Sequence, residues 1–396
     1  MELDLDPALR DIIVAILSLS FIVFVALFGH VPALRKTPIG WGHHFIWKTM
    51  PRWFTTVDLK LTGGLMVRTI KGLFNYVMYE KHPLIQLFYL GLVSGGLYLF
   101  YLGAWDRLWS PFHKVMVPVI SSLPYITLYL ASYTDPGYIL PENHRGAMKL
   151  YPFDYINFKP GYHCSTCRFE KPARSKHCPI CKHCIAKHDH HCVWINNCVG
   201  HKNVKHFFAF LMSTNIILFY GFYLTSIMIH QLVVESLPAG TDVSKLGWGE
   251  YFNQYMLCLV LDVCLGIVCL LCMMTGLMSI GFTGYHFYLL WAGTTTNETF
   301  KWSDWKEDIA AEEVWMARDP VRNPYTGRWP SKGPLNAYNW PVQTDKLVYR
   351  IVSPDEMEYL DKHLVWNKVE SIQELENIYD IGFWKTLEGV IWDLKF

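Results

Sequence analysis

Five long apolar runs constrain the fold of this chain more than any other feature of its sequence. A helix needs about 20 mostly apolar residues to cross the hydrocarbon core of a bilayer, and lipid-facing backbone must satisfy its own hydrogen bonds. The runs are Ile12–Phe28, Pro83–Trp105, Val115–Thr134, Phe207–Met228 and Tyr255–Tyr285, with Asp262 as the one charged residue inside them. Buried helices of a soluble protein are the alternative, but these runs are too many and too long for it. The sequence therefore predicts a membrane α-helical fold with five transmembrane helices.

The composition and the first residues agree with an uncleaved first helix. Charged residues make up 17% of the chain, against about 25% in an average soluble domain. A signal peptide would begin with basic residues and end at a small-residue cleavage site. Residues 1–11 instead carry Glu2, Asp4, Asp6 and Asp11 against Arg10. We therefore expect residues 1–34 to form an extra N-terminal transmembrane helix.

The distribution of Lys and Arg predicts the orientation of the helices. Eight lie in the connection from Gly29 to His82 and eleven between Asp135 and Lys205, whereas the connection from Met228 to Tyr255 holds only Lys245. Because cytoplasmic loops carry the excess of Lys and Arg, we expect a lumenal N-terminus. The expected parts are a basic cytosolic loop (35–82), helices two and three (83–134), a cytosolic cysteine-rich domain (135–205), helices four and five (206–293) and a cytosolic tail (294–396).

A cluster of Cys and His residues carries the chemistry. Seven of the eleven cysteines lie in the stretch HCSTCRFEKPARSKHCPICKHCIAKHDHHCVWINNCVGHKN, from His163 to Asn203. Two Cys-x2-Cys pairs followed by further Cys and His residues are typical of zinc sites, and the stretch holds enough ligands for two such sites with one cysteine to spare. Cys192 ends the string Asp189-His190-His191-Cys192, and a thiol beside histidine and carboxylate is how a nucleophile is activated. On spacing alone, the alternative is that all of these residues are zinc ligands or polar loop residues.

This stretch resembles the DHHC-type protein S-acyltransferases, the palmitoyltransferases. Their pattern C-x2-C-x9-H-C-x2-C-x2-C-x4-D-H-H-C-x5-C matches residues 164–198 without a gap. Asp135-Pro136-Gly137 and Thr295-Thr296-Asn297-Glu298 match the family's D-P-G and T-T-x-E motifs, and residues 377–382 resemble its tail motif, with Thr386 where the family has an asparagine. More loosely, the chain is similar to the fungal subgroup that acts on SNAREs and other single-span proteins near the endoplasmic reticulum. This resemblance implies a location in the endoplasmic reticulum or Golgi membrane.

The resemblance implies the role of each site residue. One structural zinc would be held by Cys164, Cys167, His177 and Cys184, and the other by Cys178, Cys181, His191 and Cys198. Cys192 would be the nucleophile, His190 its acid–base partner and Asp189 the residue that orients His190. The implied reaction is ping-pong transfer of a palmitoyl group from acyl-CoA through Cys192 to cysteine thiols of membrane proteins. Membrane lipid is the other expected partner, and no nucleic acid is expected.

Some expectations rest on position alone. Trp194, Phe207 and Phe210 are candidate walls of an acyl-chain cavity, and Arg174, Lys202 and Lys205 are candidate contacts for CoA phosphates. In the tail, Ser303–Ala317 and Pro354–Ile378 are expected as helices. The main alternative function is a non-catalytic zinc-containing membrane adaptor, which would have no need of Cys192. A RING-like module lacks this nucleophile string, and a transporter is disfavoured because Asp262 alone is too little for an ion pathway.

Overall fold

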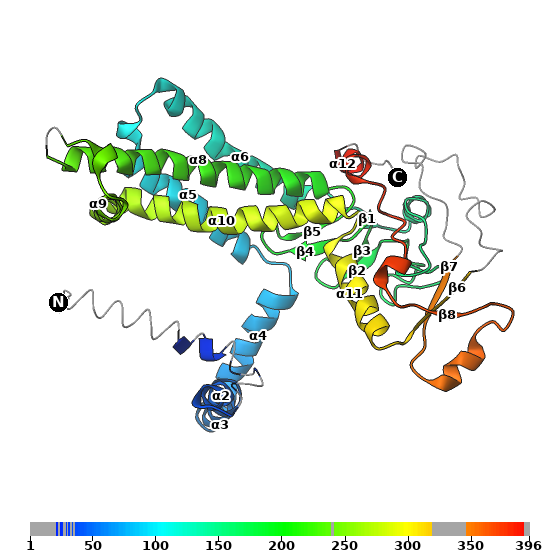
Figure 1. Ribbon diagram of the computed structural model, residues 1–396. Coiled ribbons are helices and arrows are strands. Elements are labelled where there is room, and N and C mark those ends of the chain that lie inside the picture. The colour runs from blue at the N-terminus through cyan, green and yellow to red at the C-terminus, as the bar shows by residue number, and fades with distance from the viewer. Residues whose placement is uncertain are drawn as a thin grey trace. The chain divides into compact units, whose positions relative to one another are not determined.

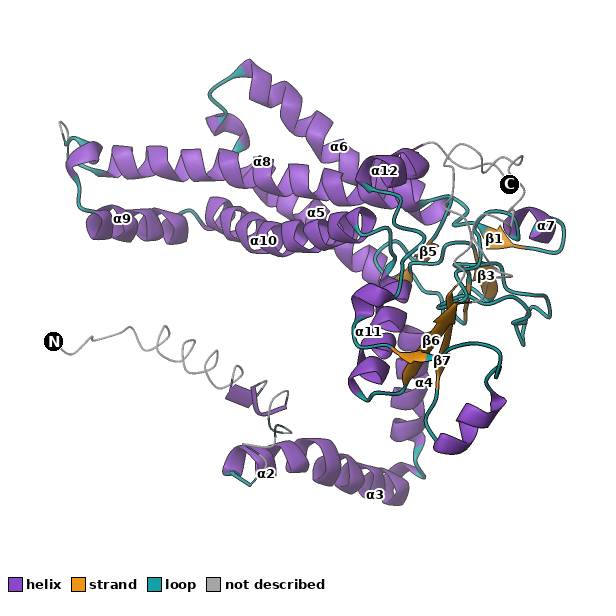
Figure 2. Cartoon of the chain, turned by 45° about the vertical axis from the view of Figure 1, so that its right-hand side comes forward, coloured by secondary structure: helices purple, strands orange, loops and turns teal. Residues whose placement is uncertain are grey.

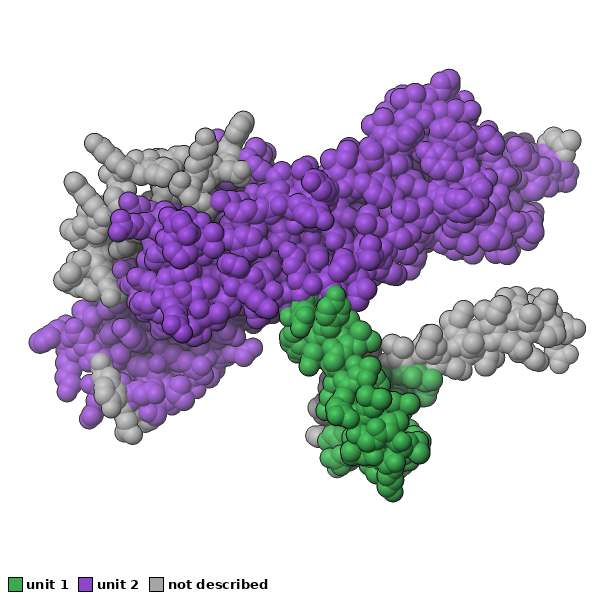
Figure 3. Space-filling view, turned by 180° about the vertical axis from the view of Figure 1, so that it is seen from behind, with its two compact units in different colours: residues 1–80 green, residues 81–396 purple. Residues whose placement is uncertain are grey.

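A computed structural model describes residues 36–238, 241–318 and 346–391, together with scattered positions between 21 and 34. The chain divides into two compact units, residues 1–80 and 81–396, which are coloured separately in Figure 3. Each unit is described by itself below.

Four helices of the second unit are long and apolar enough to cross a membrane: α5 (Leu84–Gly103), α6 (Pro111–Tyr133), α8 (Val204–Ser236) and α10 (Val263–Trp291). α8 packs against both α6 and α10, and α10 also packs against α5 (Figure 1). Leu224, Met228 and Ile229 of α8 form the centre of their shared core. The prediction of a membrane α-helical protein is confirmed by these four helices. The predicted first span, Ile12–Phe28, lies largely outside the described residues.

The fifth predicted run, Tyr255–Tyr285, is wrong as a single helix. It is divided into α9 (Trp248–Leu261) and α10, because Asp262 has non-helical backbone angles (φ −95°, ψ 85°) and caps α10 by accepting a hydrogen bond from Leu265 N–H at 3.1 Å. Its carboxylate also pairs with Arg107, in the short 3-10 helix η2 (Trp105–Arg107). Asp262 is therefore a capping and pairing residue at a helix junction. A second 3-10 turn, η3 (Val243–Lys245), precedes α9.

The first unit is helical where the sequence predicted a connecting loop. It contains α2 (Pro38–His44), the π-helical turn η1 (Phe45–Thr49), α3 (Met50–Thr62) and α4 (Leu65–Tyr79). Proline stands at the first or second position of both α2 and α3, where the missing N–H leaves no helical bond unmade.

The cysteine-rich region forms two small sheets that follow α6 (Figure 2). Strands β1 (Tyr138–Ile139), β3 (His183–Ile185) and β2 (Lys176–Cys178) make the first sheet in that order, and β4 (His190–Cys192) and β5 (Asn197–Val199) make the second. A short helix, α7 (His144–Ala147), lies between β1 and β2 in the chain.

Three polar residues fasten this domain to the C-terminal end of α6. Asp135 accepts hydrogen bonds from the N–H groups of Gly137 and Tyr138 at 2.8 and 2.9 Å, and its other carboxylate oxygen pairs with Lys202 at 3.0 Å. The Asn197 amide donates to the carbonyl of Thr134 at 3.0 Å, and the Asn203 amide donates to the carbonyl of Ala131 in α6 at 3.5 Å. A side-chain donor thus reaches a backbone carbonyl at the end of α6, where the helix itself supplies no partner.

The tail differs from the sequence prediction in both of its helices. The predicted helix Ser303–Ala317 is instead α11 (Thr296–Ala310) followed by strand β6 (Val314–Arg318), because the capping box of Thr295 and Glu298 starts the helix earlier. The predicted helix Pro354–Ile378 is wrong, since it contains the 3-10 turns η6 (Pro354–Tyr359) and η7 (Ile372–Glu374) and strand β8 (Asn367–Lys368). β7 (Lys346–Arg350), β6 and β8 form a three-stranded sheet in that order, and α12 (Phe383–Ile391) follows.

Candidate catalytic and metal-binding site

Two turns of the cysteine-rich domain share one backbone geometry. In each Cys-x2-Cys pair, the N–H of the second cysteine points at the sulfur of the first, at 3.3 Å for Cys167 and Cys164 and at 3.4 Å for Cys181 and Cys178. The next residue, Arg168 or Lys182, has φ near +60° and donates its N–H to the carbonyl of the first cysteine at 2.8 Å. Such turns aim both sulfurs of a pair at one point, as a shared metal requires.

The structure brings together the same two sets of four residues that the resemblance implied. In each set, the donor atoms all lie within 4.8 Å of one another. His177 Nδ1 lies 3.4 Å from Cys167 Sγ and 3.9 Å from Cys184 Sγ, and His191 Nδ1 lies 3.4 to 3.7 Å from the sulfurs of its set. A tetrahedral zinc with ordinary bonds would separate its ligands by about 3.5 to 3.8 Å. Three sulfurs and one imidazole at this spacing fit zinc at both places.

Strand register explains how the two metal sets interleave. His177 is paired with Cys184 across β2 and β3, and both belong to the first set. His191 is paired with Cys198 across β4 and β5, and both belong to the second set. Because side chains alternate along a strand, the ligand His191 faces one way, while its neighbours His190 and Cys192 share the opposite face.

Asp189 and His190 form a hydrogen-bonded pair beside the thiol. His190 Nδ1 lies 2.7 Å from Asp189 Oδ2. Burial alone would lower the pKa of His190, but its hydrogen bonds to Asp189 and Cys192 raise that pKa to about 10. Burial alone would raise the pKa of Asp189, but its hydrogen bond to His190 and the N–H of Thr296 hold it below its usual range. The pair therefore favours a carboxylate next to an imidazolium.

Cys192 is buried against the membrane helices. It is 5% exposed and belongs to an apolar cluster with Tyr89 of α5, Leu128 of α6 and Phe210 of α8. Of the three candidate cavity residues, Phe207 and Phe210 lie in this cluster, and Trp194 packs edge-on against Tyr89 with ring centroids 6.4 Å apart. Phe207 packs against the rings of His190 and His286, at 5.5 and 4.9 Å between centroids.

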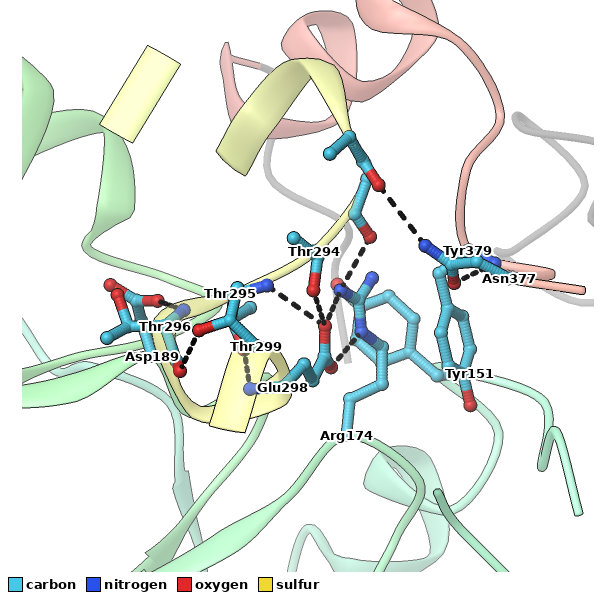
Figure 4. Close-up of polar contacts among 12 residues, drawn as sticks. Tyr151, Arg174, Asp189, Thr294, Thr295, Thr296, Glu298, Thr299, Asn377 and Tyr379 are labelled. Carbon is cyan, nitrogen blue, oxygen red and sulfur yellow. Dashed lines mark hydrogen bonds and ion pairs between the residues drawn. The ribbon is translucent and has the colours of Figure 1, made fainter. Parts of the chain in front are cut away.

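The segment after α10 contacts the catalytic string directly, as Figure 4 shows. Thr296 N–H donates to Asp189 Oδ1, and Thr295 Oγ1 donates to the carbonyl of His188 at 3.5 Å. Glu298 forms a bidentate pair with Arg174, at 2.7 and 2.5 Å, and both side chains are 2% exposed. The Thr-Thr-Asn-Glu motif thereby ties α10 and α11 to the metal-binding domain.

Arg174 is fully engaged in this pair and so is wrong as a contact for CoA phosphates. Besides Glu298, it donates to the carbonyl of Gly293 at 3.0 Å and lies over the ring of Tyr379, 4.4 Å from its centroid. Burial explains the pairing, because a charge removed from water needs a partner of opposite sign. Lys202, a second candidate, pairs with Asp135.

The tail motif, residues 377–382, packs against the segment that follows α10. Tyr379 Oη donates to the carbonyl of Pro152 at 2.7 Å, and the Asn377 amide donates to that of Ala292 at 3.2 Å. Gly293 has φ +61°, and a Cβ there would lie 2.6 Å from the Tyr379 carbonyl oxygen, so only glycine fits. Thr386 of α12 is half-buried and donates to the carbonyl of Gly382, just before that helix, at 3.0 Å.

Sequence reasoning missed His286 of α10. Its Nδ1 lies 3.9 Å from Asp189 Oδ2, its ring centroid lies 5.6 Å from that of His190, and it is 5% exposed. A lone histidine in an apolar run has no spacing pattern that links it to a motif nearly a hundred residues earlier. Two further histidines, for which the sequence indicates either a solvated position or one next to the metal ligands, are buried: His188 and His201. His188 Nε2 lies 3.8 Å from Cys198 Sγ, beside the second set of metal-binding residues.

Comparison with known proteins supplies the family. A family described as DHHC palmitoyltransferase matches residues 157–303. The chain is 37% identical to Palmitoyltransferase swf1 of Emericella nidulans, over 96% of both chains. It is 38% identical to Palmitoyltransferase SWF1 of Neurospora crassa, over 95% of this chain and 90% of the relative. The chain belongs to the DHHC palmitoyltransferase family.

The relatives also support the fungal subgroup. Palmitoyltransferase swf1 of Schizosaccharomyces pombe is 31% identical over 95% of this chain, whereas Palmitoyltransferase ZDHHC4 of mouse is 29% identical over 64% of it. This member of the family is thus an integral membrane enzyme, a protein-cysteine S-palmitoyltransferase of the fungal Swf1 subgroup. It carries two Cys/His clusters suited to zinc.

Proposed function

We propose that this palmitoyltransferase takes its acyl group from acyl-CoA onto Cys192 and passes it to cysteine thiols of membrane-associated proteins by a ping-pong mechanism. The observation that carries the proposal is the shared face of β4, on which His190, hydrogen-bonded to Asp189, stands beside a thiol buried among membrane helices. Acyl-CoA has a water-soluble CoA part and a lipid-soluble acyl chain. Its thioester, which joins the two, is therefore reached best by a thiol at the boundary between membrane and water.

The first half-reaction uses His190 as the proton carrier. An imidazolium beside Cys192 stabilises the thiolate, which is the nucleophilic form of cysteine. The thiolate sulfur attacks the thioester carbonyl, the bond from that carbon to the CoA sulfur breaks, and CoA leaves with the proton of His190. Neutral His190 then accepts a proton from an acceptor thiol, whose sulfur attacks the Cys192 thioester and releases Cys192 as thiolate. Asp189 orients His190 throughout. The two zincs, held by the eight ligands above, would stabilise the fold of the strands that carry these residues.

The helices offer a place for the acyl chain. Val93 borders the cluster around Cys192 and also lines a cavity of about 70 Å³ among α5, α6, α8 and α10. The other lining residues are almost all apolar, among them Leu97, Ile120 and Leu224. Each buried CH₂ contributes about 0.8 kcal/mol, so a long chain that passes Phe210 and widens this cavity would bind strongly.

Lysines near α11 replace Arg174 as candidate contacts for CoA phosphates. A hollow of about 530 Å³ is lined by Lys159, Lys171, Lys176 and Lys301. Lys301 lies over the ring of Phe158 and donates to the carbonyl of Asn157 at 2.9 Å. Lys171 and Lys176 are therefore the better placed of these to attract a polyanion. We also propose that this hollow faces the cytosol, that the N-terminus is lumenal and that the protein lies in the membrane of the endoplasmic reticulum.

Labelling of purified protein tests the proposal. Full-length protein incubated with radiolabelled palmitoyl-CoA should acquire label that hydroxylamine releases, as a thioester requires. Cys192→Ser should abolish the label while both zincs remain, and His190→Ala should slow labelling by about 100-fold or more. Cys264→Ser, which changes a half-buried thiol of α10, is the matched control and should label normally. Equal labelling of wild type and Cys192→Ser would refute the mechanism and favour the adaptor alternative.

A further inference from the structure

Helix α4 of the first unit has one apolar face that is exposed. Met66, Ile70, Leu73 and Val77 follow the spacing that places residues on one side of a helix. The first three are 53%, 55% and 60% exposed. Arg68 and Asn75 stand on the opposite side of the helix, and Lys71 lies at the edge of that polar side. A continuous apolar face that is this exposed is more typical of a binding surface than of an ordinary protein surface.

Helix α3 repeats the pattern. Met50, Phe54, Val57 and Leu61 have the same spacing, and Leu61 is 78% exposed. Three tryptophans lie on or just before this helix with more than half of each side chain exposed: Trp41 at 67%, Trp47 at 58% and Trp53 at 66%. Tryptophan is enriched where a bilayer meets water, because its ring is apolar and its N–H is polar.

The corner between the two helices is fixed by specific contacts. Gly63 and Gly64 both have positive φ, +66° and +83°, which other residues rarely adopt. The Asp58 carboxylate accepts hydrogen bonds from the N–H groups of Met66 and Val67, at 3.2 and 2.9 Å, and so caps the first turn of α4. The two apolar faces thus belong to a defined structure.

Both ends of this helical region join membrane-crossing segments. At its start, Trp47 Nε1 donates to the carbonyl of Ala26 at 3.0 Å, and Ala26 lies in the predicted first span. At its end, only residues 80–83 separate α4 from α5. The region is therefore tethered to the bilayer at both ends, which makes lipid the nearest apolar environment.

The charge of the region matches an anionic surface. Residues 38–79 contain five Lys or Arg residues and one acidic residue, Asp58, which is already used in the corner described above. Lysines and arginines near the cytoplasmic leaflet are attracted by its negatively charged lipids. A protein partner would need both an apolar groove and a negative rim, whereas an anionic bilayer supplies both together.

We propose that α2, η1, α3 and α4 form a membrane-surface element on the cytosolic leaflet. The apolar faces of α3 and α4 enter the boundary between headgroups and acyl chains, and Lys60 and Lys71 bind anionic phospholipid headgroups. This role is separate from palmitoyl transfer, and it relies on the cytosolic orientation of residues 35–82.

Photolabelling of the full-length protein tests the proposal. The protein is reconstituted in bilayers of phosphatidylcholine alone or with phosphatidylserine, each with a trace of phospholipid that carries a diazirine on its acyl chain. Mass spectrometry then locates the adducts. We expect adducts on Met66, Ile70, Leu73 and Leu61, none on Arg68 or Asn75, and a higher yield with phosphatidylserine.

Variants that remove lysine charges show whether the lysines bind anionic lipid or merely lie near the bilayer. Lys60→Gln with Lys71→Gln should lose the phosphatidylserine effect, whereas Lys306→Gln with Lys362→Gln, two exposed lysines of the tail, should keep it. Self-acylation of Cys192 in the same bilayers should persist in both variants, so failure of the lipid proposal is distinguishable from failure of the catalytic one. Absence of adducts from residues 41–79, adducts around the whole circumference of α4, or an unchanged phosphatidylserine effect in the first variant would each overturn the proposal.

Discussion

Asp189 is the residue at which the separate parts of the site meet. Its Oδ2 binds His190 on the catalytic strand, and its Oδ1 accepts the N–H of Thr296 at the start of α11. His286, from within α10, lies 3.9 Å from the same Oδ2. One carboxylate thus receives contacts from the zinc domain, a membrane helix and the tail, so changes in any of the three should reach the catalytic histidine.

His286→Phe should slow the first half-reaction without unfolding the protein. Phenylalanine fills the same apolar surroundings of Phe207 and Phe282 but no longer approaches Asp189 with a polar atom. A small misplacement of a catalytic group costs up to about 100-fold in rate, and we expect a loss of 10- to 100-fold in the single-turnover rate of self-acylation.

For His286→Phe, the single-turnover rate of self-acylation is compared with the KM for palmitoyl-CoA. The KM for palmitoyl-CoA and the zinc content should stay near their wild-type values, because His286 touches neither. The control is His230→Phe, which removes the 2.9 Å contact of an α8 histidine with Tyr251 and should leave the rate unchanged. A wild-type rate in His286→Phe would show that Asp189 does not depend on it.

Glu298→Ala should destabilise the fold strongly. Removal of one partner from a buried ion pair leaves the other charge buried and uncompensated, at a cost of about 3 to 5 kcal/mol, and Arg174 is 2% exposed. Thermal unfolding in detergent, followed by fluorescence, should show a marked fall in Tm. Glu307→Ala changes an exposed residue of the same helix and should move stability by no more than about 0.5 kcal/mol. Equal Tm values for the two variants would contradict this account of the pair.

The residues of the site could be predicted from sequence only where a local pattern carries them. The eight proposed metal ligands and the proposed catalytic residues Asp189, His190 and Cys192 lie within 35 consecutive residues and match a family pattern. Arg174 lies in the same stretch, but its buried pairing with Glu298 depends on a contact across more than a hundred residues. The same is true of His286, so neither role could be read from spacing.

Among the elements of the fold, the short hairpins of the zinc domain depend most on metal. Each strand from β2 to β5 has three residues, and two-stranded hairpins of this kind are marginally stable at best in water. The cross-strand ligand pairs His177–Cys184 and His191–Cys198 hold each hairpin closed when zinc is bound.

Cys164→Ala should therefore lower both zinc content and yield. The free energy of zinc binding is also folding free energy in such sites. Elemental analysis of wild type should give two zincs per chain, and the variant should give fewer, with a lower Tm. Cys272→Ala, a half-buried cysteine of α10 outside both sets, should retain two. Active wild-type protein with one zinc or none would contradict the assignment of two sets.

Long elements were predictable and short ones were not, for a physical reason. The apolar runs of α5, α6 and α8 are set by the thickness of a bilayer, so hydropathy alone located them. The sheet of β6, β7 and β8 depends on Val314, Val348 and Val369 meeting from distant parts of the tail. The break at Asp262 depends on a single capping residue whose partner, Arg107, is 155 residues away.

At the scale of the whole molecule, the orientation of the chain decides whether the chemistry is possible. Acyl-CoA and reducing conditions are cytosolic, and an oxidising lumen would endanger the free thiol and the zinc thiolates. In the proposed topology, residues 35–82, residues 135–205 and the tail share the cytosolic side. The contact of Thr296 with Asp189 requires the end of α10 and the zinc domain to share that side, as the proposed topology has it.

Engineered glycosylation sites test this topology. Asp242→Asn creates the sequon Asn-Val-Ser in the connection between α8 and α9, which should be glycosylated because the proposed topology puts that connection in the lumen. Asp361→Asn with His363→Thr creates a sequon in an exposed part of the tail, and it should stay unmodified. The natural sequon at Asn297, a buried residue, should also remain unmodified. Glycans on the tail sequon and none at position 242 would reverse the orientation.

The most direct test of the central claim is transfer from an isolated acyl-enzyme. Wild-type protein is loaded with radiolabelled palmitoyl-CoA, freed of all CoA compounds by gel filtration, and mixed with a cysteine-containing acceptor peptide in a membrane. The account predicts that label leaves Cys192 and appears on the peptide at the same rate, with no added palmitoyl-CoA, and that Cys192→Ser transfers none. Label that reaches the peptide only while palmitoyl-CoA is present would contradict a covalent intermediate on Cys192.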